Sequence, residues 1–149
     1  PNGVTPFGPP GFIISNGTLD PQRGENFEVG ARWDGAAGQR VQATYYYMPV
    51  RAEIDFDSDP AVLSYANLGE SLHQGGLLHA RWPLGGGLAA EANATVTPTT
   101  IRGGALDGNQ INAVPKGGAS GRLTWSPDAP WSLDVSARWV AKQWLDKEN

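Results

Sequence analysis

The two histidines of the chain, His73 and His79, are the first candidates for metal binding or acid–base chemistry. They are six positions apart in a segment that alternates as a β-strand does, so they share one face. At about 3.4 Å per residue they would lie roughly 20 Å apart, which is too far to chelate one ion together. We interpret His79 as a single polar side chain facing water.

Three alternating aspartates, Asp55, Asp57 and Asp59, resemble the start of a calcium-binding loop. Pro60 stands where such a loop needs glycine, and Ala66 stands where it needs a bidentate glutamate. We therefore interpret this segment as an acidic loop. The sequence leaves open whether the loop binds a cation, and no other metal site or cofactor is expected.

No nucleophilic constellation is predicted, so we do not expect an enzyme. The chain has no cysteine, and neither histidine has a plausible serine and aspartate partner in the sequence. Gly118-Ala119-Ser120-Gly121 misses the spacing of a nucleophile elbow by one residue. Gly85-Gly86-Gly87 is interpreted as a tight turn, because no lysine or helix signal makes it a phosphate-binding loop.

Polar side chains recur at every second position through most of the chain, and they are predicted to line one face of a sheet. Exposing an arginine of this set to lipid would cost roughly 2–4 kcal/mol, so the set would face a hydrated interior. The predicted members are Glu28, Arg32, Gln42, Thr44, His79, Arg81, Glu91, Asn93, Arg122, Asp134 and Arg138.

Six segments with period-two alternation are predicted to be the strands that position this polar row. Each has an apolar face that includes alanine, leucine, valine or an aromatic residue. The segments are 26–33, 40–48, 73–82, 88–97, 119–125 and 131–139. We expect Phe27, Leu78, Leu123 and Leu133 on one convex surface, and Arg32, Arg81 and Arg138 on the concave one.

The connections alternate between short and long, which is typical of an outer-membrane β-barrel. Those at 34–39, 83–87 and 126–130 are turn-like, whereas those at 49–72 and 98–118 are several times longer. Tryptophans gather beside the short turns, as in an aromatic girdle where hydrocarbon meets water. The predicted girdle residues are Trp33, Trp82, Trp125 and Trp131.

Composition excludes several classes of protein. The 149 residues include 20 glycines and 12 prolines, and only 17% are charged, which argues against a helix bundle. A net charge of −4 argues against binding to nucleic acid, because no basic stripe is present. No stretch approaches the 18 or so apolar residues of a transmembrane helix.

Four segments resemble motifs of TonB-dependent receptors, in order over residues 19–149. They are Leu19-Asp20-Pro21-Gln22 leading to Phe27-Glu28-Val29-Gly30; Tyr65-Ala66-Asn67-Leu68-Gly69 followed by Gly75; Asn112-Ala113-Val114-Pro115-Lys116; and Trp139 to Asn149. The sequence departs from the family at Leu77 and His79, where glutamate is common, and at Asp20 and Gln22, where lysine and glutamate are usual.

The resemblance implies an all-β fold: an antiparallel transmembrane β-barrel segment of about six strands in an incomplete barrel of the bacterial outer membrane. It implies active uptake of a scarce ligand, most often a ferric siderophore and less often cobalamin or a sugar. The implied partners are the TonB complex, the receptor's own plug domain, the small ligand and outer-membrane lipid. His79 could contact an imported iron complex, and ligand-capturing residues are expected in the loops at 49–71 and 98–118.

Both ends of the sequence suggest a piece of a longer receptor. The chain starts at Pro1 and ends on Asp146-Lys147-Glu148-Asn149, so residues 1–149 are interpreted as part of the barrel domain without the plug domain and the final strands. Two alternatives remain open at this point. One is a small complete outer-membrane barrel acting as an adhesin or hydrolase, and the other is a soluble carbohydrate-binding β-sandwich.

Overall fold

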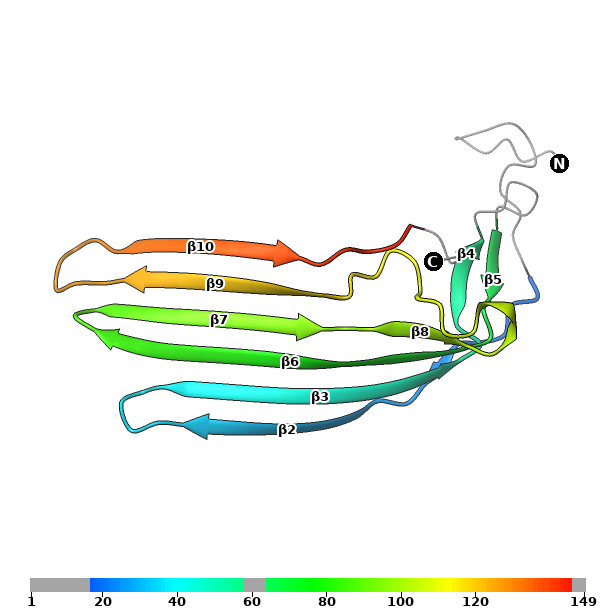
Figure 1. Ribbon diagram of the computed structural model, residues 1–149, viewed down its shortest axis with the longest axis horizontal. Helices are drawn as coiled ribbons and strands as arrows, with labels where there is room; N and C mark the ends of the chain where they lie inside the picture. The colour runs from blue at the N-terminus through cyan, green and yellow to red at the C-terminus, as the bar shows by residue number, and fades with distance from the viewer. Residues whose placement is uncertain (1–16, 58–63, 146–149) are drawn as a thin grey trace, which may run out of the picture.

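The computed structural model describes residues 17–57 and 64–145, which form a long, curved antiparallel sheet (Figure 1). Ten strands and one short 3-10 helix are present in this part of the chain. Their bounds are β1 Arg23–Gly24, β2 Phe27–Asp34, β3 Arg40–Arg51, β4 Ile54–Asp57, β5 Ser64–Asn67, β6 Glu70–Gly85, β7 Leu88–Val96, β8 Thr99–Arg102, η1 Gly104–Leu106, β9 Gly117–Trp125 and β10 Leu133–Val140.

The main sheet has the strand order β2-β3-β6-β7-β9-β10, with every pair antiparallel. Two short strands extend it at one end, where β1 pairs with β3 and β8 pairs with β6. Strands β4 and β5 follow β3 and precede β6 in the sequence, and they pair with each other in a separate hairpin. The six long strands are therefore neighbours in the sheet in the order in which they follow along the chain, as in an up-and-down barrel wall.

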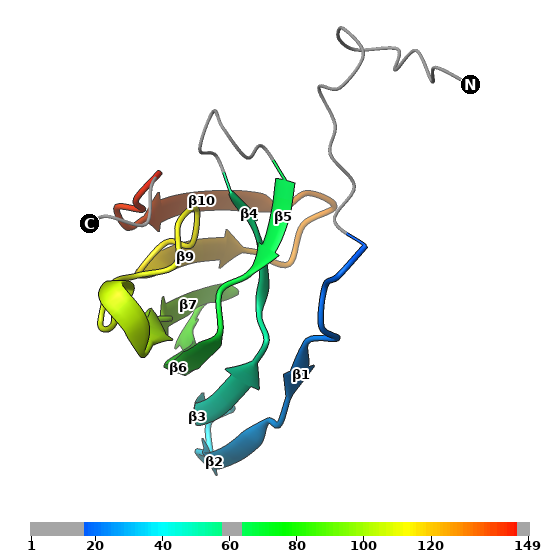
Figure 2. The same ribbon diagram turned by 90° about the vertical axis from the view of Figure 1, so that its right-hand side faces the viewer.

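The sheet is open and a single layer thick in the described ranges. Seen from the end that carries the long connections, its strands follow an arc, and the β4–β5 hairpin stands on the concave side (Figure 2). Both outer strands, β2 and β10, lie at free edges of the sheet. The prediction of an antiparallel, incomplete barrel segment is thereby confirmed. Within residues 17–57 and 64–145, no second layer packs on this sheet as a β-sandwich requires.

Short and long connections lie at opposite ends of the sheet (Figure 1). The β6–β7 turn contains three glycines in a row. Gly85, Gly86 and Gly87 all take positive φ angles, of 89°, 58° and 77°. Residues with a Cβ rarely adopt such angles, which explains the triple glycine. Between the described residues of β3 and β6, and between β7 and β9, the chain instead forms the extra elements β4, β5, β8 and η1.

The six predicted long strands are present, with shifted ends. Strand β3 continues to Arg51, and β6 starts at Glu70 rather than at His73, because their extensions pair with each other and with β1 and β8. The prediction that the last strand starts at Trp131 is wrong. Extending the β9–β10 register would place Trp131 opposite Pro127, which has no N–H to donate, and β10 begins at Leu133.

A small apolar core lies at the long-connection end of the sheet. Val50 of β3, Leu72 of β6, Ile101 of β8 and Ile111 are all buried. Backbone hydrogen bonds fold the segment after η1 back onto β8, with Ile101 N donating to Asn109 O at 2.8 Å. The described residues of the long connections are thus ordered, and we call the structure that they form at this end of the sheet the cap.

Candidate functional site: a two-faced barrel wall

The strand registers assign every predicted polar-row residue to one face of the sheet. Across the six long strands one row reads Arg32, Gln42, His79, Asn93, Ser120 and Arg138, and the next reads Asp34, Arg40, Arg81, Glu91, Arg122 and Ser136. Glu28 and Thr44 share this face on β2 and β3, and Asp134 shares it on β10. We call this surface the polar wall.

Ion pairs link neighbouring strands across the polar wall. Arg122 Nε lies 2.9 Å from Asp134 Oδ1, and Arg81 Nε lies 3.6 Å from Glu91 Oε1. These side chains are about half exposed, so each pair adds little to stability. The register is set by the two faces instead, because a slip of one strand by one residue would turn its arginine to the apolar side.

Asp34 and Arg40 belong to the polar wall but are absent from the predicted set. Asp34 accepts from Arg32 Nε at 2.8 Å and from Arg40 Nε at 2.6 Å. Sequence reasoning placed Asp34 in the turn, whereas β2 includes it and pairs it with Arg40. The alternation of Arg32, Asp34 and Arg40 with the apolar residues was the signal that could have found this cluster.

A hydrogen-bonded chain connects the middle of the polar wall. His79 Nδ1 lies 2.9 Å from Asn93 Oδ1, and Asn93 Nδ2 donates to Ser120 Oγ at 3.4 Å. His73, on the same face of β6, instead contacts Glu53. The two histidines share no partner, and no group of three potential metal ligands occurs in the described ranges.

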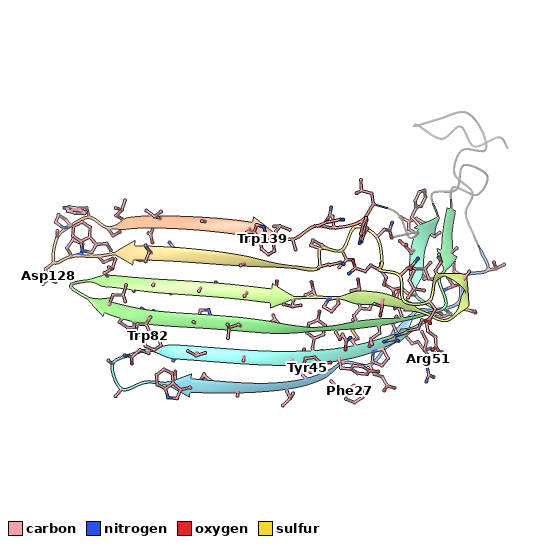
Figure 3. All side chains as sticks on the ribbon, viewed as in Figure 1. Phe27, Tyr45, Arg51, Trp82, Asp128 and Trp139 are labelled. Atoms are coloured by element: carbon pink, nitrogen blue, oxygen red, sulfur yellow. The ribbon has the colours of Figure 1, made fainter. Side chains whose placement is uncertain are left out.

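The opposite face of the sheet is apolar and exposed. It carries Val29 at 68% exposure and Val135 at 58%, on strands at opposite edges of the sheet. The register adds Phe27, Leu78, Leu123 and Leu133 to the same face. Figure 3 shows side chains along both sides of the strands, with Phe27 and Tyr45 near each other on adjacent strands. We call this surface the apolar face.

The four predicted girdle tryptophans lie together at the short-turn end. The Trp33 and Trp82 rings stack with centroids 6.0 Å apart, and the Trp125 and Trp131 rings meet edge to face at 5.1 Å. Trp125 Nε1 also donates to Gly86 O at 3.2 Å. Figure 3 shows Trp82 at this end. Trp131 reaches the cluster from the turn rather than from a strand.

A second polar cluster, which sequence reasoning did not find, lies at the long-connection end. The Glu53 carboxylate is buried, accepts a hydrogen bond from Ser71 Oγ, and lies 3.1 Å from His73 Nε2 with each of its oxygens. Burial raises the pKa of the Glu53 carboxyl, but the hydrogen bonds from His73 and Ser71 outweigh it, and the pKa is held below its ordinary value. The carboxylate lies between the serine and the histidine, so the histidine cannot activate the serine as in a catalytic triad.

The acidic loop is described only in part. Asp55 lies in β4, where its Oδ1 accepts from the Phe56 N–H at 2.8 Å, and Asp57 ends that strand. Asp59 lies outside the described residues, so cation binding by this loop stays a prediction. Among the residues that the structure describes, no helix is long and apolar enough to cross a membrane.

A curved, single-layer antiparallel sheet with one polar and one exposed apolar face defines the wall of a transmembrane β-barrel. The comparisons agree with this class. The family model "TonB dependent receptor-like, beta-barrel" matches residues 1–149, so the chain belongs to the TonB-dependent receptor β-barrel family. No curated protein matches the chain.

Two solved structures share the fold. The ferric yersiniabactin uptake receptor FyuA from Yersinia pestis superposes with a TM-score of 0.68 at 20% identity, over 86% of this chain. The FrpB iron transporter from Neisseria meningitidis (F3-3 variant) superposes with a TM-score of 0.56 at 16% identity, over 85% of this chain. The chain spans only 20% of the length of each of these two proteins.

Proposed function

We propose that this chain forms part of the barrel domain of an outer-membrane TonB-dependent transporter that takes up a ferric siderophore. The main support for this proposal is the separation of the polar wall from the apolar face over all six long strands. One layer thus has a surface suited to lipid and a surface suited to water. The family match supports the receptor class, and the two iron-uptake neighbours support iron as the cargo.

In this proposal the apolar face contacts lipid, and the tryptophan cluster lies at the periplasmic membrane interface. The polar wall contacts water and the plug domain of the same receptor. The long connections lie outside the cell, where the cap around Val50 and Ile101 holds the ligand-capturing loops in place. No covalent step is involved, because transport needs capture by the loops and then a rearrangement of the plug driven through TonB.

Uptake by the full-length receptor tests this function. Deleting its gene should abolish accumulation of one radiolabelled ferric siderophore from a panel, and a plasmid copy should restore it only in cells with functional TonB. Cobalamin and a labelled oligosaccharide belong in the panel as the other cargo classes. Unchanged accumulation of every ferric siderophore after deletion would contradict the iron assignment, and restoration without TonB would contradict the mechanism.

A further inference from the structure

The side of the sheet that carries the apolar face also carries a row of charged residues at the long-connection end. Arg51 of β3, Glu70 of β6 and Arg102 of β8 are direct partners across three adjacent strands. Partners in a register share a face, and side chains alternate between faces along a strand. Arg51 has the parity of Tyr45, and Glu70 has the parity of Leu78, which lies on the apolar face. The row therefore extends away from the polar wall.

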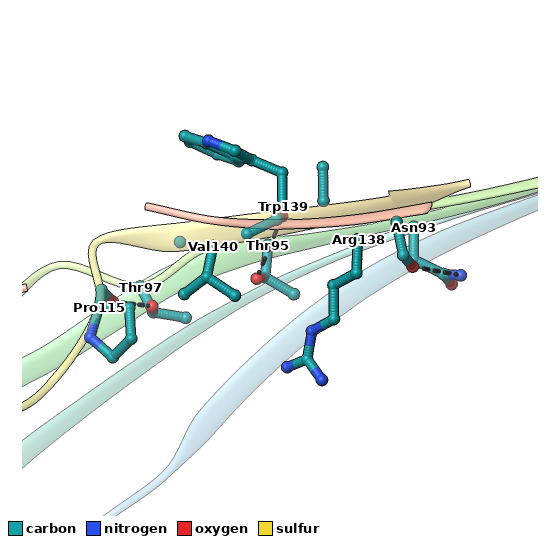
Figure 4. Close-up of a pocket in the computed structure, with 11 residues that line it drawn as sticks. Asn93, Thr95, Thr97, Pro115, Arg138, Trp139 and Val140 are labelled. Atoms are coloured by element: carbon teal, nitrogen blue, oxygen red, sulfur yellow. Dashed lines mark hydrogen bonds between the residues drawn. The ribbon is translucent and has the colours of Figure 1, made fainter. Parts of the chain in front are cut away.

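The arginines of this row differ from those of the polar wall. Figure 4 shows Arg138, on the polar wall, on the opposite side of the sheet from its neighbour Trp139. Arg51 and Arg102 are exposed on the Trp139 side, and no ion pair within the described ranges involves either of them. Neither lies at a free edge, because β3 is flanked here by β1 and β6, and β8 lies between β6 and the residues around Gln110.

The distance from the tryptophan cluster places this row just outside the hydrocarbon. Glu70 lies twelve residues from Trp82 along β6. At about 3.4 Å per residue and a tilt of roughly 40°, this separation spans about 30 Å along the barrel axis, whereas the apolar band of an outer-membrane barrel is about 25 Å tall. Figure 3 shows the order from the short-turn end as Trp82, Tyr45, Phe27 and then Arg51. The row therefore lies at the level of the lipid headgroups on the long-connection side.

The row surrounds a hollow of about 200 Å³. Its charged lining is Arg51, Glu70 and Arg102, and its apolar lining includes Tyr47, Pro49 and Leu72. Because β3 and β8 lie on either side of β6, the Cα atoms of Arg51 and Arg102 are about 10 Å apart, a gap that two arginine side chains can close on one small anion. A phosphate fits best, because each guanidinium can bind two of its oxygens.

The charges at this end of the sheet leave room for an anion. Arg23 of β1 continues the row beside Arg51. Glu25 follows in the same register, where its N–H donates to Pro49 O, and it adds a second carboxylate on this side. Three arginines and two glutamates leave one positive charge in excess. A headgroup with a net negative charge is therefore preferred over a neutral one.

A second hollow lies further down the same side of β6, within the apolar band. Its volume is about 410 Å³. Gly76 opens its floor because it has no side chain, and Tyr45 and Val96 stand around it. Gly76 is six residues from Glu70, or roughly 20 Å along the strand, which is within the length of a lipid acyl chain. One lipid molecule can thus occupy both hollows.

We propose that this surface binds one phosphorylated lipid of the outer leaflet, with its phosphate between Arg51 and Arg102 and an acyl chain over Gly76. The proposal rests on the proposed function, because that function places the sheet in the outer membrane. It differs from the general contact of the apolar face with hydrocarbon, because a particular headgroup is selected.

The test measures which lipid stays bound to the purified full-length receptor. The receptor is equilibrated, in the presence of EDTA, with equal amounts of diphosphoryl lipid A and of the dephosphorylated glycolipid with the same acyl chains. Native mass spectrometry then counts the bound copies of each. The unmodified receptor should retain the phosphorylated form with a preference of about tenfold or more, because charge-assisted contacts are lost with the phosphates. Equal retention would overturn the proposal.

Charge variants locate the selectivity. Arg51→Gln combined with Arg102→Gln should remove the preference, and Glu70→Gln should raise it, because a negative charge beside the phosphate is lost. Arg81→Gln combined with Arg122→Gln is the matched control, since it removes two arginines from the polar wall, and it should keep the preference. Heat-dependent gel mobility reports whether each barrel is folded. Equal losses in the two double variants, or a loss in Glu70→Gln, would contradict a direct contact of Arg51 and Arg102 with the phosphate.

A further variant tests the acyl-chain hollow without changing any charge. Gly76→Leu fills the second hollow, and a Cβ at this position would have only Thr44 O nearby, at 3.9 Å, so the strand should still fold. Retention of the phosphorylated lipid should fall several-fold. If Gly76→Leu has no effect and an excess of inorganic phosphate displaces the lipid, the arginines bind a free anion and the lipid site is overturned.

Lipid selectivity and transport can fail separately. Equal retention of both lipids by a receptor that still takes up a ferric siderophore would overturn the lipid site and leave the proposed function standing. Selective retention by a receptor whose deletion leaves the uptake of every ferric siderophore unchanged would overturn the cargo and leave the lipid site standing.

Discussion

Asp20 and Asn67 are 47 residues apart, and they exchange two hydrogen bonds. The Asp20 N–H donates to Asn67 Oδ1 at 2.9 Å, and Asn67 Nδ2 donates back to Asp20 O at 3.0 Å and to Ala52 O at 2.8 Å. Gln22 Oε1 accepts from Ile54 N at 3.1 Å beside them. Two segments that resemble separate family motifs therefore form one clamp, which ties the segment before β1 to the β4–β5 hairpin.

Replacing Asn67 tests this clamp. Asn67→Ala removes both hydrogen bonds with Asp20 and the one to Ala52, and a loss of about 1–3 kcal/mol of local stability is expected. Hydrogen exchange or limited proteolysis should show earlier opening around residues 20–25, with the long strands unaffected. Asn26→Ala is the control, because the Asn26 side chain donates to Glu28, two residues along the chain, at 2.6 Å. Equal protection in the two variants would contradict the role of the clamp.

The lowered pKa of the Glu53 carboxyl leads us to expect that the cap opens in acid. Its pKa in the folded protein is below the ordinary value, so the stabilisation it provides is complete above that value and is lost as pH falls through the lower folded pKa. The protection factors of the β4–β5 amides, which correct the exchange rate for its intrinsic pH dependence, should therefore fall below about pH 4. The experiment compares the protein with Glu53→Gln, which should show a smaller pH dependence.

Glu70→Gln provides the control for this titration, because Glu70 also lies at the long-connection end but is exposed. It should keep the pH profile of the unmodified protein. Loss of the profile in Glu70→Gln, or its full retention in Glu53→Gln, would assign the acid effect to another group.

Two adjacent glycines of β6 are predicted to respond differently to the same change. A Cβ at Gly75 would overlap Val96 O and lie 2.9 Å from the Tyr46 ring, whereas a Cβ at Gly76 would have only Thr44 O nearby, at 3.9 Å. Gly75→Ala should displace Tyr46 or β7 and lower the folded fraction, and Gly76→Ala should be tolerated. Gel mobility of the folded receptor measures both, and equal folding would show that the wall adjusts at Gly75.

The alternation of polar and apolar residues at every second position was sufficient to predict which residues share the polar wall and which share the apolar face. Side chains alternate strictly along a strand, so the parity of Arg32, Arg81 and Arg138 fixes their common face once each strand is located. The structure pairs these strands in the register that keeps that parity. The resemblance motifs gave the family, which the family match confirms.

The cap could not be predicted in the same way. Strand β8 is only four residues long, and its place is set by pairing with the extension of β6, which is a contact between distant segments. The Glu53 cluster likewise depends on the chain returning from β3 to the start of β6. Neither feature has a local sequence period, so only the folded arrangement shows it.

Leu77 and Leu78 give the most direct test of which face meets lipid. They are consecutive in β6 and almost equally exposed, at 44% and 46%, but Leu77 lies opposite Thr44 and Thr95 on the polar wall, whereas Leu78 lies opposite Ala43 and Ala94 on the apolar face. Leu78→Arg should destabilise the folded receptor by about 2–4 kcal/mol, because the guanidinium would enter hydrocarbon. Leu77→Arg should cost far less, because water or the plug would surround the charge. Urea or guanidinium titration of the receptor refolded in lipid vesicles measures the difference, and the reverse order of the two variants would place lipid on the polar wall and end the transporter interpretation.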